Sequence, residues 1–152
     1  KALQYYQQAL AMKQALYTGN HPSIAMSLNN VGVAYNDLGE SQKALQYYQQ
    51  ALEMIQALYT GNHPSIALSL NNVGFAYKEL GQSQKALQYY QQALVMYQAL
   101  KHPDAATAKN NIDRIKSSYI TMRFGIANQQ TILIILSMGI IAVFLSLYFD
   151  LQ

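Results

Sequence analysis

Apolar residues recur at spacings of three and four along most of this chain, which is the period of an amphipathic helix. The clearest example runs from about Gln42 to Tyr59 and is followed by a Thr-Gly-Asn turn. Its apolar positions, which we expect to be buried, are Ala44, Leu45, Tyr48, Ala51, Leu52 and Ile55. No stretch alternates apolar and polar residues with a period of two, so the pattern predicts helices and no strands.

The helical pattern is part of an internal repeat. The decapeptide KALQYYQQAL occurs at residues 1–10, 43–52 and 85–94, with a period of 42 residues. Residues 1–42 and 43–84 differ at only seven positions, which are 11, 13, 26, 33, 36, 37 and 40. Repetition at this period predicts a solenoid, in which each unit buries its apolar face only against its neighbours.

Each unit is predicted to hold two antiparallel helices. The first begins at His-Pro-Ser, where proline suits the first helical turn because its missing N–H would be unpaired there anyway. It ends near Gly39 or Gly81, because glycine readily takes the left-handed conformation that closes a helix. The predicted fold class is therefore all-α.

The two ends of the array differ from its middle. Residues 1–18 form a second helix without its partner, so we expect further repeats before Lys1 and interpret the chain as a fragment. The last unit, residues 101–118, is degenerate, because Lys109, Asp113 and Lys116 replace a leucine, a glycine and a tyrosine of the earlier units. Charged residues there suit a terminal repeat, so we expect the array to occupy residues 1–118.

Small and apolar residues of both units resemble the tetratricopeptide repeat in order and spacing. They are Leu28, Val31, Gly32, Tyr35, Gly39, Ala44, Tyr48 and Ala51, and then Leu70, Val73, Gly74, Tyr77, Gly81, Ala86, Tyr90 and Ala93. The unit length and the sequence motif HPSIA…LNNVG resemble those of the longer repeat variant found in kinesin light chains and similar bacterial proteins. This resemblance covers residues 1 to about 112 and implies a TPR-type helical-hairpin solenoid. It does not identify a partner, because the repeat serves many unrelated ones.

The resemblance also implies that the first helix of each pair lines a concave groove. Carried over to this sequence, the lining is Met26, Asn29, Val33, Asn36, Asp37, Leu68, Asn71, Phe75, Lys78 and Glu79, with Asn110 in the last unit. Four of the seven differences between the units, at 26, 33, 36 and 37, fall on this lining. A fixed frame with a varied lining predicts a peptide-binding groove. The alternative is drift at positions released from packing.

Two sets of asparagines follow the predicted groove wall. An asparagine amide both donates and accepts, so Asn29, Asn71 and Asn110 are predicted to pair with the backbone of a bound peptide. Their neighbours are predicted to cap helices or bridge repeats, and they are Asn30, Asn72 and Asn111. A shift of one residue in the alignment would exchange the two roles.

Composition removes most catalytic chemistry from consideration. Cysteine is absent, which excludes disulfides and thiolate sites. The three histidines, His21, His63 and His102, recur once per repeat and are not expected to converge on a metal ion. Phosphate-binding loops and hydrolase motifs are also absent. We therefore expect no enzyme activity, no cofactor and no small-molecule substrate.

Charge is low and concentrated in one segment. Charged residues are 11% of the chain, and the net charge is +3. Residues 1–100 are near neutral, whereas residues 101–123 contain five basic and two acidic side chains. Five basic residues with few interleaved aromatics are too few for a nucleic-acid interface, so we expect no nucleic-acid partner.

The C-terminal part carries a long apolar run. Residues 131–149 hold nineteen residues without a charge, and a helix of that length spans roughly 28 Å, close to the hydrocarbon thickness of a bilayer. We predict a single transmembrane helix there, preceded by a juxtamembrane linker at 119–130 and followed by a short tail at 150–152. The basic residues of 101–123 precede the span, which predicts that the repeats face the cytoplasm. The alternative, a buried terminal helix, would need a cavity that two and a half repeats do not offer.

Three functions are compatible with these patterns. The first is a membrane-anchored scaffold or adaptor that binds a peptide or helical segment of a partner protein. The second is the sensory or input half of a larger membrane signalling protein whose effector lies outside this fragment. The third, a kinesin light chain, is disfavoured because that family is soluble and this chain carries an apolar span.

Overall fold

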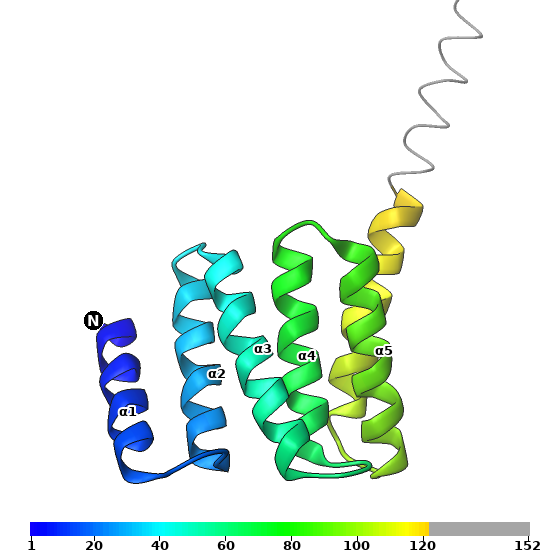
Figure 1. Cartoon of the computed structure of the whole chain (residues 1–152). Coiled ribbons are helices and arrows are strands. Elements are labelled where there is room, and N and C mark those ends of the chain that lie inside the picture. Colours follow the sequence, from blue (N-terminus) through cyan, green and yellow to red (C-terminus); the bar gives the residue numbers. More distant parts are fainter. Residues whose placement is uncertain (122–152) are drawn as a thin grey trace, which may run out of the picture. The chain divides into compact units, whose positions relative to one another are not determined.

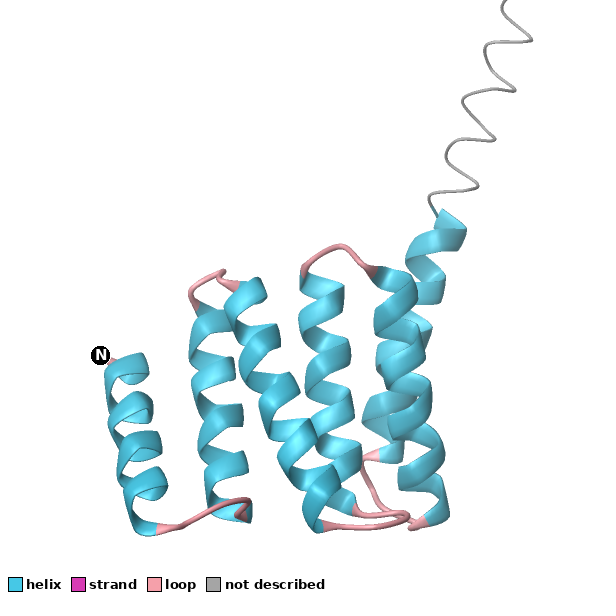
Figure 2. Ribbon diagram, in the orientation of Figure 1, coloured by secondary structure: helices cyan, strands magenta, loops and turns pink. Residues whose placement is uncertain are grey.

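The structure is a computed structural model that describes residues 1–121 of the 152-residue chain. Five complete helices lie in this part, and the chain is helical again from residue 105 to residue 121 (Figures 1 and 2). They are α1 (Ala2–Leu16), α2 (Pro22–Asp37), α3 (Ser41–Leu58), α4 (Pro64–Glu79) and α5 (Ser83–Ala99). The described residues contain no strand, which agrees with the predicted all-α class.

Each helix packs mainly against the helices that precede and follow it in the chain. The contacting pairs are α1 with α2, α2 with α3, α3 with α4, and α4 with α5, and Figure 1 shows these neighbours side by side. Residues 1–113 form one compact unit, and the residues from 114 onward belong to a second. Contacts between sequence neighbours are the signature of a solenoid, so the predicted helical-hairpin array is confirmed.

The two helices of a hairpin approach closely at a glycine. A Cβ atom on Gly32 would lie 2.6 Å from the Tyr48 ring, and one on Gly74 would lie 3.0 Å from the Tyr90 ring. Both rings are buried, so each tyrosine packs against the bare backbone of the facing helix. The apolar face predicted for the second helix is buried throughout α3, at Ala44, Leu45, Tyr48, Ala51, Leu52 and Ile55.

A histidine caps the N-terminus of the first helix in each of the two units. His21 precedes α2, and its Nδ1 accepts a hydrogen bond from the Ser23 N–H at 3.1 Å. Its ring stacks on Tyr17, with centroids 3.6 Å apart. His63 repeats both interactions before α4, with Ser65 and Tyr59. These histidines therefore cap helices, in the place that serine, threonine or asparagine commonly fills.

Glycine closes the first helices, as the sequence predicts. Gly39 has a φ of 75° and Gly81 a φ of 72°, which is the left-handed region that other residues seldom adopt. The Gly39 N–H donates to the Asn36 carbonyl at 2.9 Å, and the Gly81 N–H donates to the Lys78 carbonyl at 2.9 Å. These turns direct the chain into α3 and α5.

The degenerate last unit still buries a narrow apolar face. Ala108 and Ile112 are buried, whereas Lys109 and Asp113, which replace a leucine and a glycine of the earlier units, are exposed. The charged side chains thus lie on the solvent side, which suits the predicted end of the array.

The predicted membrane span, residues 131–149, lies outside the described residues, as do residues 122–130 of the predicted linker. Within residues 1–121, no helix combines the length and the apolar composition that crossing a bilayer requires.

Candidate peptide-binding groove

The predicted lining lies on α2 and α4, and its apolar members are exposed. We call Met26, Val33, Leu68 and Phe75 the apolar strip; their side chains are between 36% and 60% exposed. Met26 and Val33 are seven residues apart, as are Leu68 and Phe75, which places each pair two turns apart on one helix face. On α2 and α4, apolar residues occupy both the face that carries the strip and the face that packs in the core. The two faces differ in how exposed these residues are.

Asparagine side chains link the helices that carry the lining. The Asn72 Nδ2 donates to the Asn29 Oδ1 at 3.4 Å, and the Asn111 Nδ2 donates to the Asn71 Oδ1 at 3.2 Å. Each hydrogen bond joins one asparagine of the set predicted to bind a peptide to one asparagine of the set predicted to cap helices or bridge repeats. The clean division of roles that the sequence suggests is therefore wrong, because Asn29 and Asn71 take part in bridging too.

The same hydrogen bonds leave the side-chain N–H donors of two lining residues, Asn29 and Asn71, unused in the described part of the chain. Asn29 and Asn71 accept through Oδ1, and their Nδ2 groups have no hydrogen-bond partner within residues 1–121. Both residues are half-buried, and each lies between the two strip residues of its helix in the sequence. Asn110, the third predicted member, is exposed, and its side chain makes no hydrogen bond in the described part.

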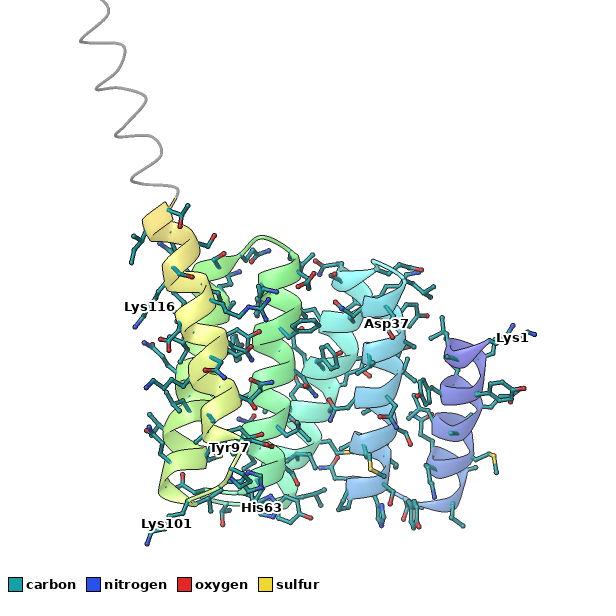
Figure 3. The ribbon with its side chains drawn as sticks, turned by 180° about the vertical axis from the view of Figure 1, so that it is seen from behind. Lys1, Asp37, His63, Tyr97, Lys101 and Lys116 are labelled. Atoms are coloured by element: carbon teal, nitrogen blue, oxygen red, sulfur yellow. The ribbon has the colours of Figure 1, made fainter. Side chains whose placement is uncertain are left out.

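The polar ends of the two linings differ. On α2, Asn36 Oδ1 accepts from the Ser41 hydroxyl at 3.3 Å, and Asp37 near the end of the helix is exposed (Figure 3). On α4, the Lys78 Nζ lies 2.9 Å from the Glu79 Oε1 and 5.4 Å from the centroid of the Phe75 ring. The first unit thus offers a carboxylate beside an amide, and the second offers an ion pair beside an aromatic ring.

A tyrosine cluster connects α2 and α4 to their neighbouring helices, and it was not predicted from the sequence. The rings of Tyr35 and Tyr47 stack with centroids 5.4 Å apart, Lys43 lies 5.3 Å from the Tyr35 ring, and the Gln7 Nε2 donates to the Tyr35 hydroxyl at 3.2 Å. The next unit repeats all three interactions with Tyr77, Tyr89, Lys85 and Gln49. The cluster ties each first helix to the second helices on both sides, and its recurrence at a period of 42 is the signal that could have revealed it.

A separate hollow of about 530 Å³ lies between α3, α4 and α5. Four glutamines border it, and the full lining is Gln56, Asn62, Ile66, Leu70, Gln88, Gln91, Gln92, Val95 and Met96. None of these residues belongs to the predicted lining, so the candidate groove and this hollow are distinct surfaces.

Comparison with known proteins agrees with the repeat and the fold. The sequence profile of the tetratricopeptide repeat family matches residues 1–57 and 24–99. A comparison with curated protein sequences found no match. The matched ranges together cover more than half of the chain, and they include α1 to α5.

Solved structures share the fold at low sequence identity. TPR-like repeats of nearly identical sequence, from a Podosopora anserina protein described as a kinesin light chain, superpose with a TM-score of 0.68 at 22% identity. That match covers 74% of this chain and 55% of the other, so this chain spans about half the length of its relative.

Two further structures extend the comparison. A Rap protein complexed with Competence and Sporulation Factor has a TM-score of 0.68 at 22% identity, over 78% of this chain and 33% of the other. The N-terminal domain of stress-induced protein-1 from C. elegans has a TM-score of 0.53 at 16% identity, over 74% and 76%. Together with the repeat match and the helical-hairpin array, these likenesses lead to one conclusion: the chain belongs to the tetratricopeptide repeat family.

Proposed function

We propose that the array is a scaffold that binds a peptide or a helical segment of a partner protein along α2 and α4. The observation that carries this proposal is the apolar strip, because four large apolar side chains of α2 and α4 remain exposed while the other large aliphatic residues of these two helices, Ile24, Leu28, Val31, Ile66, Leu70 and Val73, are buried. Exposed apolar surface of this kind marks interaction sites in soluble proteins. The Rap structure, which contains Competence and Sporulation Factor, supports the idea that this fold accommodates such ligands.

The geometry favours a ligand with apolar anchors and an accessible backbone. Met26 and Val33 flank Asn29 on α2, and Leu68 and Phe75 flank Asn71 on α4. Apolar anchors of the ligand would cover the strip, while the two asparagine Nδ2 groups donate to its carbonyl oxygens. The affinity would come from apolar burial, and the amides would fix the register of the ligand.

The differences between the two units would set selectivity. Phe75 with Lys78 on α4 replaces Val33 with Asn36 on α2. The pair Phe75 and Lys78 suits an aromatic or acidic side chain of the ligand, because it offers a ring and an ammonium group. The pair Val33 and Asn36 suits a smaller, neutral side chain. One ligand would therefore meet two different subsites in a fixed order.

The experiment exchanges one lining for the other. The double variant Phe75→Val with Lys78→Asn is compared with the parent in a peptide-library titration. We expect the preferred peptide to change at the position that faces α4, with a melting temperature close to that of the parent because these side chains are not in the core. An unchanged preference would show that the lining does not select the ligand.

We further propose that residues 131–149 anchor the array in a membrane as a single span, with the repeats on the cytoplasmic side. The support is the uncharged length of the run and the basic segment before it. The intact chain should stay with membranes after carbonate extraction, and a version ending at Tyr119 should be released. Recovery of the intact chain in the soluble fraction would refute the anchor without affecting the groove.

A further inference from the structure

Three histidines make the same hydrogen bond, each at the start of a helical segment. In each case the ring Nδ1 atom accepts from the backbone N–H two residues later, at 3.1, 3.2 and 3.3 Å. The pairs are His21 with Ser23, His63 with Ser65, and His102 with Asp104. Figure 3 shows the second of these histidines at the end of the array where α4 begins. The recurrence makes this cap a regular part of the fold.

The cap requires an Nδ1 atom without a proton. A neutral imidazole accepts a hydrogen bond through one ring nitrogen, whereas the imidazolium carries a hydrogen on both nitrogens and can only donate. Protonation of the ring therefore removes the hydrogen bond. It also places a positive charge at a helix N-terminus, where the helix dipole disfavours cations. All three rings are half-buried, so protons from the solvent can reach them.

The surroundings of His21 and His63 offer little compensation for such a charge. Each ring stacks on a tyrosine, with centroids 3.6 Å apart for Tyr17 and 3.7 Å apart for Tyr59. A tyrosine ring attracts a cation, which is one favourable contact against the lost hydrogen bond and the helix dipole. Among the described residues, neither histidine forms an ion pair with an acidic side chain. The Lys13 ammonium group lies 5.9 Å from the Tyr17 ring and adds repulsion near His21.

His102 differs from the other two because an acid lies within reach. Its Nδ1 atom is 3.7 Å from the Asp104 Oδ2 atom, and its ring stacks on Tyr97 with centroids 5.1 Å apart. A protonated His102 therefore exchanges its backbone donor for a carboxylate partner. The third unit supplies an internal comparison for the first two.

We propose that His21 and His63 make the starts of α2 and α4 sensitive to acid, in the pH range in which histidine side chains commonly titrate. The unfolded chain has no cap to lose, so it takes up these protons more readily than the folded chain does. Stability therefore falls as the pH falls, and the first turns of both helices loosen. These turns lead directly into Met26 and Leu68 of the apolar strip. Acid should for this reason also weaken peptide binding, a consequence that rests on the proposed function.

The test compares the intact chain at about pH 7.5 and about pH 5. Asparagine caps helices well and does not titrate, so the double variant His21→Asn with His63→Asn keeps its caps at both pH values. We expect the melting temperature of the parent to fall by about 5–10 °C more than that of the double variant. The matched control is His102→Asn, which should show the same fall as the parent.

Amide hydrogen exchange locates the effect in the chain. The reporters are the Ser23 and Ser65 amides, which donate to the two rings. Their protection relative to an unstructured chain at the same pH should drop about tenfold in acid. The protection of the Asp104 amide should drop less, because its histidine has the carboxylate nearby.

Two results would overturn the acid-sensitive caps. An equal fall in melting temperature for the parent and the double variant would assign the acid sensitivity to other groups. Unchanged protection of the Ser23 and Ser65 amides would show that the caps stay closed. A peptide affinity that is the same at both pH values, while these amides lose protection, would overturn only the effect on the apolar strip. Failure of the caps and failure of the proposed function can therefore be told apart.

Discussion

In Asn29 and Asn71 the oxygen and the nitrogen of the side-chain amide differ in their hydrogen bonding. The Oδ1 atoms accept from the asparagine of the next unit, which ties neighbouring first helices together. The Nδ2 atoms have no partner in the part of the chain that the structure describes. The internal bond fixes the orientation of the amide, so the donor is held in place before a ligand arrives.

This division of the amide can be tested with two variants. Asn71→Ala should lose the donor and weaken peptide binding by roughly 0.5–1.5 kcal/mol, the usual net value of one hydrogen bond. Asn111→Ala should break the same internal hydrogen bond but keep the Asn71 donor. The two variants should therefore lower the free energy of unfolding to a similar degree, but Asn111→Ala should weaken peptide binding less. The measurements are peptide titration and denaturant unfolding. Equal weakening of binding by both variants would show that the bridge, and not the donor, matters.

The roles of single polar residues were the hardest to predict from the sequence. Asn29 and Asn30 are adjacent, so a shift of one residue exchanges their predicted roles, and only side-chain geometry shows that bridging uses both sets. The histidine caps were missed for another reason. The Nδ1 of His21 accepts the N–H that a serine or asparagine oxygen commonly accepts, and histidine is not among the residues from which a cap is usually predicted.

The helix boundaries were predicted closely, because proline and glycine mark them. Pro22 and Pro64 stand in the first turn of α2 and α4, and Gly39 and Gly81 close them in the left-handed conformation. These residues act through backbone sterics alone, which depend little on the surroundings. Local signals of this kind are readable from the sequence, whereas contacts between distant side chains are not.

The faces of α2 show where periodicity alone falls short. Ile24 and Leu28 are buried and Met26 and Val33 are exposed, yet all four are apolar. A pattern of apolar residues therefore predicts the helix but does not separate its core face from its lining. Comparison of α2 with α4 does separate them here, because the buried Ile24 and Leu28 recur as Ile66 and Leu70, whereas the exposed Met26 and Val33 are replaced by Leu68 and Phe75.

The array as a whole should lose stability in alkali. Burial, with a smaller contribution from the nearby Asp37, raises the pKa of Tyr48 to about 12, and burial with Asp104 nearby raises the pKa of Tyr97 to about 12. The unfolded chain would lose these protons near pH 10, so between about pH 10 and 12 the folded state holds more protons. The contribution of these two tyrosines to the free energy of unfolding should be constant below pH 10 and should fall above it by about 2–3 kcal/mol for each tyrosine.

Denaturant unfolding at pH 8 and at pH 11.5 would measure this loss. The matched variant is Tyr48→Phe, which keeps the ring against Gly32 and removes the ionisable hydroxyl. Its stability should fall less between the two pH values than that of the parent. An identical loss in both proteins would assign the alkaline transition to groups other than Tyr48.

The near identity of the two units also bears on how long such an array can become. Helix α3 meets α2 and α4 through the residues that an added 42-residue unit would present again, so an inserted copy would find a complementary surface on both sides. Every further copy would add one asparagine bridge and one pair of apolar lining residues. Copy number could therefore change by recombination between the duplicated segments without redesign of any interface, and the reach of the scaffold would grow in steps of one unit.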